Sequence, residues 1–192
     1  MKRSIKGFTL VEMLIVIVAV GVIGSVTARL LYQGSDLFVH ETNRQSFVNE
    51  VRSTFWRISR ESHGQVSKDQ FYSSNSNILY LKHANTKEKQ ISINSPLIKF
   101  INDNNNDNII DDDDAQYTLS NYPLSSSDVV RYYDNNYNEI EPLQSGLSEQ
   151  QSKTVHLIKI DITFNNDEDD LNLSSYIFPQ NFKYGEKMGY HD

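Results

Sequence analysis

The sequence contains no cysteine, which excludes disulfide bonds, zinc sites with thiolate ligands and cysteine nucleophiles. The histidines are scattered, without a pair at metal-ligand spacing: His40, His63, His83, His156 and His191. The eight glycines are also dispersed, and no phosphate-binding loop, HExxH motif or nucleophile elbow occurs. We therefore expect no enzyme activity.

Positive charge is also scarce, because 18 lysines and arginines stand against 25 aspartates and glutamates, for a net charge of -7. Such a balance repels a phosphate backbone, so nucleic-acid binding is not expected. The length of 192 residues suits one sizeable domain, or a small domain with an extension.

A long apolar run begins at Phe8 and ends at Ala28, and Glu12 is the only charged residue within it. A helix of about 20 such residues crosses the hydrocarbon core of a bilayer. Positive residues precede the run at Lys2, Arg3 and Lys6. Since positive flanks stay on the cytoplasmic side, we expect a single span with the rest of the chain exported.

Glu12 does not suit a plain anchor, because a carboxylate inside the membrane costs on the order of 2.5 kcal/mol or more. The segment from Lys6 to Leu14, KGFTLVEML, resembles the class III signal of type IV prepilins and type II secretion pseudopilins. The resemblance implies that a prepilin peptidase removes residues 1–7 by cleavage between Gly7 and Phe8. It also implies N-methylation of the new amine of Phe8.

Glu12 has a use in this setting. The carboxylate can neutralise the Phe8 amine, on its own helix or, as the family implies, on a neighbouring subunit. Glu12 is thus predicted to be an assembly residue. The resemblance further places the chain in the bacterial inner membrane, with a periplasmic C-terminal head that is extracted into a pilus or pseudopilus.

The fold predicted with this resemblance is α+β and pilin-like, a long N-terminal helix packed on an antiparallel β-sheet head. Its parts are the leader at 1–7, a transmembrane half at 8–28, an amphipathic half at 29–63 and a β-rich head at 65–192. Apolar residues at Phe47, Val51, Phe55 and Ile58 follow the helical period and form an apolar stripe along the helix. Leu30, Leu37 and Phe38 begin the same stripe with less regular spacing. Trp56, the only tryptophan, is expected in the core or between stem and head.

In the head, short apolar segments separated by turn residues predict strands. Two hairpins are expected, Ile78–His83 with Glu88–Ile93 and Asp128–Tyr133 with Tyr137–Ile140. Further strands are expected in the segment SPLIKFI that ends at Ile101, at Thr154–Phe164, where one alternating set is apolar, and at Leu171–Phe178. The ending YIFPQN, Tyr176 to Asn181, resembles that of J-type minor pseudopilins.

The acidic loop at 103–114, DNNNDNIIDDDD, matches the ligand spacing of a twelve-residue calcium loop. The predicted ligands are Asp103, Asn105, Asp107, the carbonyl of Ile109, Asp111 and Asp114. Asn108 stands where such loops have glycine, and Asp114 replaces the usual glutamate. The alternative interpretation is a solvated loop in a chain rich in asparagine and aspartate.

The predicted function is that of a minor pilin or pseudopilin in a type II secretion pseudopilus or a type IV pilus. Its expected partners are the prepilin peptidase, other pilin subunits and the inner membrane, with calcium as a ligand. The alternative is a binding module at the filament tip that recognises a surface, a secreted protein or DNA. The acidic composition argues against DNA.

Overall fold

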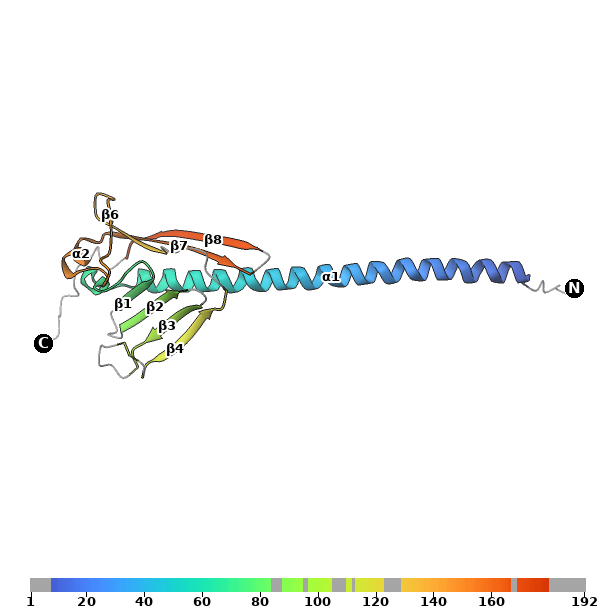
Figure 1. Cartoon of the computed structure of the whole chain (residues 1–192), viewed down its shortest axis with the longest axis horizontal. Coiled ribbons are helices and arrows are strands. Elements are labelled where there is room, and N and C mark those ends of the chain that lie inside the picture. The colour runs from blue at the N-terminus through green and yellow to red at the C-terminus, as the bar shows by residue number, and fades with distance from the viewer. Residues whose placement is uncertain are drawn as a thin grey trace, which may run out of the picture. The chain divides into compact units, whose positions relative to one another are not determined.

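The computed structural model describes residues 8–83, 88–94, 97–104, 110–111, 113–122, 129–166 and 169–179. The chain divides into two compact units, Met1–Ser46 and Phe47–Asp192. The boundary falls inside one continuous helix, α1 (Leu10–His63), and Figure 1 shows the order of the elements that follow it. The second unit is the head.

In the first unit, every described residue is exposed, although most side chains up to Ala28 are apolar. Hydroxyl groups within this run bond to carbonyls of the preceding turn, Ser25 Oγ to Val22 O at 2.8 Å and Thr27 Oγ1 to Ile23 O at 2.9 Å. Such bonds satisfy polar groups in an apolar environment. By length and composition, α1 can cross a membrane.

In the head, α1 buries one face. Phe47, Val51 and Ile58 are at most 1% exposed, and Phe55 packs against the same cluster, so the predicted apolar stripe is confirmed here. The proposed beginning of that stripe is wrong, because its three residues lie in the first unit and are 63–73% exposed (Leu30, Leu37 and Phe38). The prediction for Trp56 is also wrong, since this side chain is 70% exposed.

The first sheet has the strand order β1-β2-β3-β4, and all its strands are antiparallel. Its strands are β1 (Ile78–Lys82), β2 (Glu88–Asn94), β3 (Leu97–Asn102) and β4 (Ala115–Ser120). The predicted first hairpin is confirmed by the pairing of Ile78 with Ser92 and of Lys82 with Glu88. The strand β4 was not predicted, because half of its residues are exposed and its sequence lacks an apolar alternation.

The second sheet has the order β6-β5-β7-β8, again antiparallel. Its strands are β5 (Val130–Tyr133), β6 (Glu139–Ile140), β7 (Leu157–Asn165) and β8 (Asp170–Ile177). The predicted apolar face of β7 is confirmed, since Ile158, Ile160, Ile162 and Phe164 are buried. The end of the predicted J-type motif, Gln180 and Asn181, lies outside the described residues.

The predicted start of β7 is wrong by three residues, because Thr154 is the last residue of a short helix, α2 (Glu149–Thr154), and the strand begins only at Leu157. The first turn of α2 is held by a reciprocal capping box, in which Gln151 N donates to Ser148 Oγ at 3.2 Å and Ser148 N donates to Gln151 Oε1 at 3.0 Å. The pattern Ser-x-x-Gln is a sequence signal for a helix start. This signal outweighs the β propensity of Thr154.

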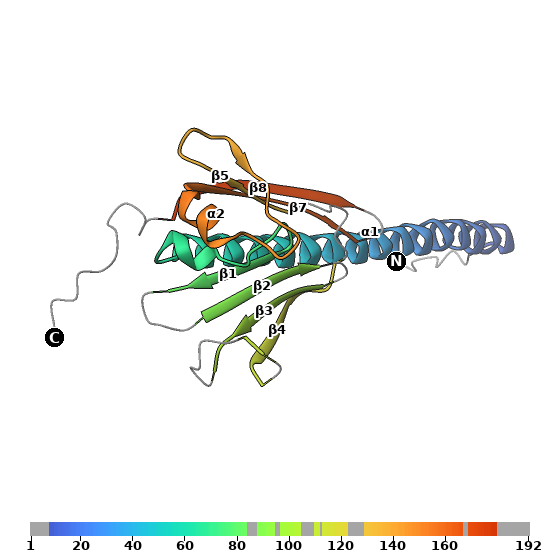
Figure 2. The same cartoon turned by 60° about the vertical axis from the view of Figure 1, so that its left-hand side comes forward.

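The head portion of α1 lies between the two sheets, as both views of the molecule show (Figures 1 and 2). One hydrophobic cluster joins all three layers, with Val51 and Ile58 from α1, Ile91 from the first sheet and Ile160 and Phe164 from the second. The predicted α+β, pilin-like fold class is confirmed. The sheet portion consists of two four-stranded sheets.

A buried ionic cluster fixes the end of α1 to the first sheet. Glu61 is 7% exposed, and its Oε2 accepts a hydrogen bond from Lys89 Nζ at 2.7 Å. Lys89 Nζ also lies 3.2 Å from Nδ1 of His83, whose Nε2 lies 2.8 Å from the Glu61 carbonyl oxygen. Because an ammonium group only donates, Nδ1 accepts and Nε2 carries the proton that is donated to Glu61.

The helix ends at His63, as the following glycine predicts. Glycine is needed at position 64 because there is no space for a side chain. A Cβ on Gly64 would stand 2.7 Å from His83 Nε2, so a larger residue would push His83 away from the ionic cluster. Gly146 does need its conformational freedom, with φ at 96°, and a Cβ there would also clash with the backbone carbonyl of Ser73.

Candidate functional site

The helix start places Glu12 in a capping box that is built from the prepilin-type segment itself. Thr9 precedes the first helical residue, and both its backbone N and its Oγ1 donate to Glu12 Oε2 at 2.9 Å. Glu12 N in turn donates to Thr9 Oγ1 at 3.3 Å. Two backbone amides at the helix start are thereby satisfied.

This geometry gives Glu12 a second role, which the sequence analysis missed. The signal was available, because Thr-x-x-Glu is the capping-box pattern. Both bonds from Thr9 end on the same oxygen, Oε2. A carboxylate oxygen pair has about four acceptor positions, so Glu12 can cap its own helix and still accept a bond from an amine.

The predicted processing residues lie at the edge of the described chain. Phe8 is 80% exposed, and Gly7 lies outside the described residues. Cleavage before Phe8 would leave its amine one residue from Thr9, at the positive end of the helix dipole. After such a cleavage, the Glu12 carboxylate would lie near both the new amine and the positive end of the dipole.

The acidic loop is described only in part. Asn105, Asp107 and Ile109 lie outside the described residues. Asp103 is fully buried and Asp114 is 6% exposed, whereas Asp111 is exposed. Among the residues that the structure describes, no three acidic or imidazole groups gather closely enough to hold a metal ion.

Asp114 closes this loop through its carboxylate. Oδ1 accepts from Asn104 N at 2.9 Å, and Oδ2 accepts from Asp111 N at 3.1 Å. Both oxygens keep a free lone pair after these bonds, so this arrangement is compatible with a bound cation and also holds the loop ends without one.

Comparison with known protein families finds a match at residues 2–28 to the prokaryotic N-terminal methylation motif. A search of curated proteins finds no match to the chain. The motif, together with the apolar start of α1, fits a membrane-anchored pilin and points to a structural subunit rather than to an enzyme. The chain therefore carries the type IV prepilin-like signal at its N-terminus.

Proposed function

We propose that the chain is a minor pilin or pseudopilin, a structural subunit of a type II secretion pseudopilus or a type IV pilus. A prepilin peptidase cleaves it between Gly7 and Phe8, and the new amine of Phe8 is methylated. The mature chain resides in the inner membrane with its head in the periplasm. It enters the filament through α1, where Glu12 pairs with the amine of a neighbouring subunit.

The observation that carries this proposal is the methylation motif at 2–28, which includes the exposed apolar part of α1 up to Ala28. None of the described residues before Phe47 is buried. An apolar helix of this length needs either lipid or the helices of other subunits around it. A filament subunit that starts in a membrane meets both environments in turn.

Leader removal tests the proposal. The mature chain isolated from cells that contain a prepilin peptidase is expected to begin at a methylated Phe8, as read by N-terminal mass spectrometry. Gly7→Val should leave residues 1–7 attached, because the branched side chain obstructs the cleavage site. Gly24→Val is the matched control within the span, since no atom lies within 4 Å of a Cβ there. An intact leader on the unmodified chain would refute the proposal.

We also propose that the loop at 103–114 binds calcium. Its support is the ligand spacing together with the burial of Asp103 and Asp114, the first and last predicted ligands. Hydrogen bonds already compensate the burial of Asp114, and Asp103 also has an interaction within the chain, so the proposal rests on the ligand spacing and on the position of these carboxylates at the two ends of the loop. Calcium would supply positive charge, with Asp103, Asp111 and Asp114 as described ligands and the other three outside the described residues.

Thermal unfolding of the full chain in detergent tests calcium binding. At a hundredfold excess over the dissociation constant, calcium adds about 2.7 kcal/mol, which raises the unfolding temperature by roughly 5–10 °C. Asp111→Asn should abolish this rise. Asp113→Asn, a neighbouring exposed aspartate outside the predicted ligand set, should preserve it. If calcium does not change the unfolding temperature of the unmodified chain, calcium binding is refuted and the loop is a solvated loop.

A further inference from the structure

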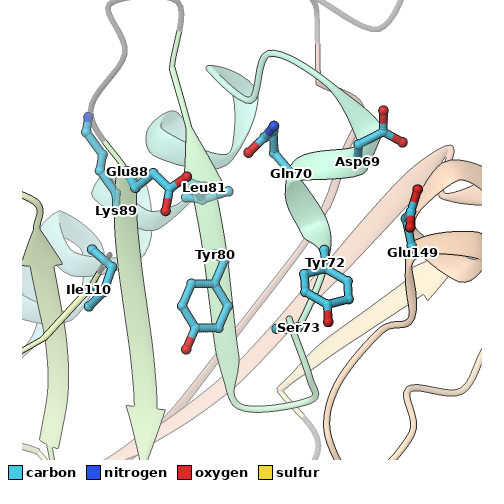
Figure 3. A pocket seen from close by; sticks show the side chains of 10 residues that line it. All are labelled: Asp69, Gln70, Tyr72, Ser73, Tyr80, Leu81, Glu88, Lys89, Ile110 and Glu149. Carbon is cyan, nitrogen blue, oxygen red and sulfur yellow. The ribbon is translucent and has the colours of Figure 1, made fainter. Parts of the chain in front are cut away.

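A groove of about 750 Å³ lies in the head beside β1, an edge strand of the first sheet (Figure 3). It is formed mainly by η1 (Lys68–Phe71), β1 and the first residues of β2 and α2. Tyr72 and Tyr80 both line it, and Figure 3 shows their hydroxyl ends pointing the same way. The volume is within the range of about 300–1,000 Å³ that is usual for small-molecule sites.

Both tyrosines stand on backbone that the fold holds in place. Tyr80 alternates with two buried leucines of β1, which turns its ring away from the core. Tyr72 follows Phe71, which is fully buried. The next residue is fixed as well, because Ser73 N donates to Leu147 O at 3.0 Å. A ligand that stacks on these rings therefore has little backbone to order, which favours binding.

The groove also contains hydrogen-bonding groups that the fold does not use. Within the described part of the chain, five of its side chains have no hydrogen-bond partner: Asp69, Gln70, Tyr72, Ser73 and Tyr80. A carboxylate only accepts hydrogen bonds, whereas hydroxyl and amide groups both donate and accept them. The ligand that suits this groove therefore carries several groups that can do both.

Most charged groups of the groove are already compensated. Three ion pairs contain them: Glu88 with Lys82 at 3.2 Å, Glu149 with Lys153 at 2.6 Å and Lys89 with Glu61 at 2.7 Å. A charged ligand would gain little, since it would have to displace one of these partners. A neutral ligand leaves the pairs intact, and the paired carboxylates still have acceptor positions for its hydroxyl groups.

The edge of β1 is closed to a peptide strand. Its alternate amides are already bonded to side chains: Ile78 N to Asn75 Oδ1 at 2.8 Å, Tyr80 N to Ser74 Oγ at 3.0 Å and Lys82 N to Gln65 Oε1 at 2.7 Å. An added strand would need the amides on this side of β1 for its own hydrogen bonds. The groove is thus left to a ligand that binds through the rings and the polar side chains.

We infer that the groove binds a neutral oligosaccharide of pyranose sugars. A pyranose ring has an apolar face of C–H groups, which stacks on an aromatic ring, and a rim of hydroxyl groups that both donate and accept hydrogen bonds. Tyr72 and Tyr80 supply the stacking surface. Asp69, Gln70 and Ser73 supply hydrogen bonds.

Sugar binding goes beyond the proposed function, because no residue of the groove belongs to the prepilin-type segment or to the apolar part of α1. It is measured on the purified chain without partner subunits. The result therefore does not depend on leader cleavage or on filament assembly.

Saturation-transfer NMR of the full chain tests the inference with three neutral sugars, maltotriose, cellotriose and tri-N-acetylchitotriose. The detergent is lauryldimethylamine oxide, because a detergent with a sugar head group would itself compete for the groove. At least one of the three sugars should receive saturation, strongest on the C–H protons of one ring face. Its affinity should change less than about twofold between about 50 and about 500 mM salt, since no ion pair forms. No transfer to any of the three, or a steep loss with salt, would overturn the inference.

Substitutions locate the binding in the groove. Tyr72→Ala and Tyr80→Ala should each weaken binding by about tenfold, the effect of losing one stacked ring, whereas Tyr72→Phe keeps the ring and should cost less than about threefold. Tyr117→Ala is the matched control, because Tyr117 is an exposed tyrosine of β4 outside the groove, and it should bind as the unmodified chain does. Near-ultraviolet circular dichroism checks that each variant is folded. Unchanged binding in folded Tyr72→Ala, or an equal loss in Tyr117→Ala, would contradict the inference.

Discussion

Replacing Glu12 by glutamine is expected to abolish co-assembly with other pilin subunits, while membrane insertion, cleavage after Gly7 and the helix start are retained. Glutamine keeps the capping box with Thr9, because an amide oxygen accepts the same bonds. It removes only the charge. An amine left unpaired in an apolar filament costs about 3–5 kcal/mol, so recovery of partner subunits should fall by at least about a hundredfold.

The measurement is the amount of other pilin subunits that copurify with the tagged chain from membranes. Thr9→Val is the matched control, because it removes the side-chain cap seen at Glu12 Oε2 and preserves the charge. This control should lose helix stability by about 1 kcal/mol and keep most of its partners. If Thr9→Val abolishes assembly and Glu12→Gln does not, Glu12 acts through the helix cap and its assembly role is wrong.

The long periodic elements were predictable because burial repeats with the geometry of the backbone. The stripe Phe47, Val51, Phe55 and Ile58 follows the helical period, and the alternation along β7 gives its buried face directly. The exposure of Trp56 could have been predicted from the same helical period. It follows Phe55 by one residue, hence by about 100° around the helix axis, which takes it off the buried stripe.

Other features depend on contacts that no local pattern contains. The strand β4 joins the first sheet although Gln116, Tyr117 and Thr118 are exposed, since its pairing with β3 supplies the hydrogen bonds. Glu61 and Lys89 are far apart in sequence, and nothing around either residue predicts a buried pair. The groove lined by Tyr72 and Tyr80 (Figure 3) likewise joins η1 (Lys68–Phe71), β1, β2 and α2, whose positions only the folded head defines.

The candidate site divides in the same way. The segment from Lys6 to Leu14 is recognisable because it belongs to a motif that is one short continuous sequence. The acidic loop satisfies a spacing rule, but a metal site also requires its oxygens to converge on one point. Spacing cannot establish that convergence, which is why the calcium prediction depends on a titration.

The pair of Glu61 and Lys89 supports the second large prediction, that Lys89→Met destabilises the head by about 3–5 kcal/mol near neutral pH, since it leaves a buried carboxylate uncompensated. Burial alone would raise the pKa of Glu61, but the hydrogen bond and charge of Lys89, with a smaller contribution from Arg60, lower it below its usual value of 4.5. Urea unfolding of the full chain, followed by near-ultraviolet circular dichroism, measures the change. Lys82→Met, which removes the more exposed pair with Glu88, should cost less than about 1 kcal/mol.

The pH dependence distinguishes an ionic effect from lost packing. In the unmodified chain, the lowered pKa of Glu61 means that its stabilising contribution is complete above about pH 4.5 and is lost as the pH falls through the folded-state pKa. In Lys89→Met, the interaction with Lys89 that lowers the pKa of Glu61 is gone, and burial should raise this pKa. The variant should therefore lose stability as the pH increases above about 4.5. Glu61→Leu combined with Lys89→Met should recover most of the loss, because no charge remains buried. A loss in Lys89→Met that is constant with pH and persists in the double variant would assign it to packing of the lysine side chain.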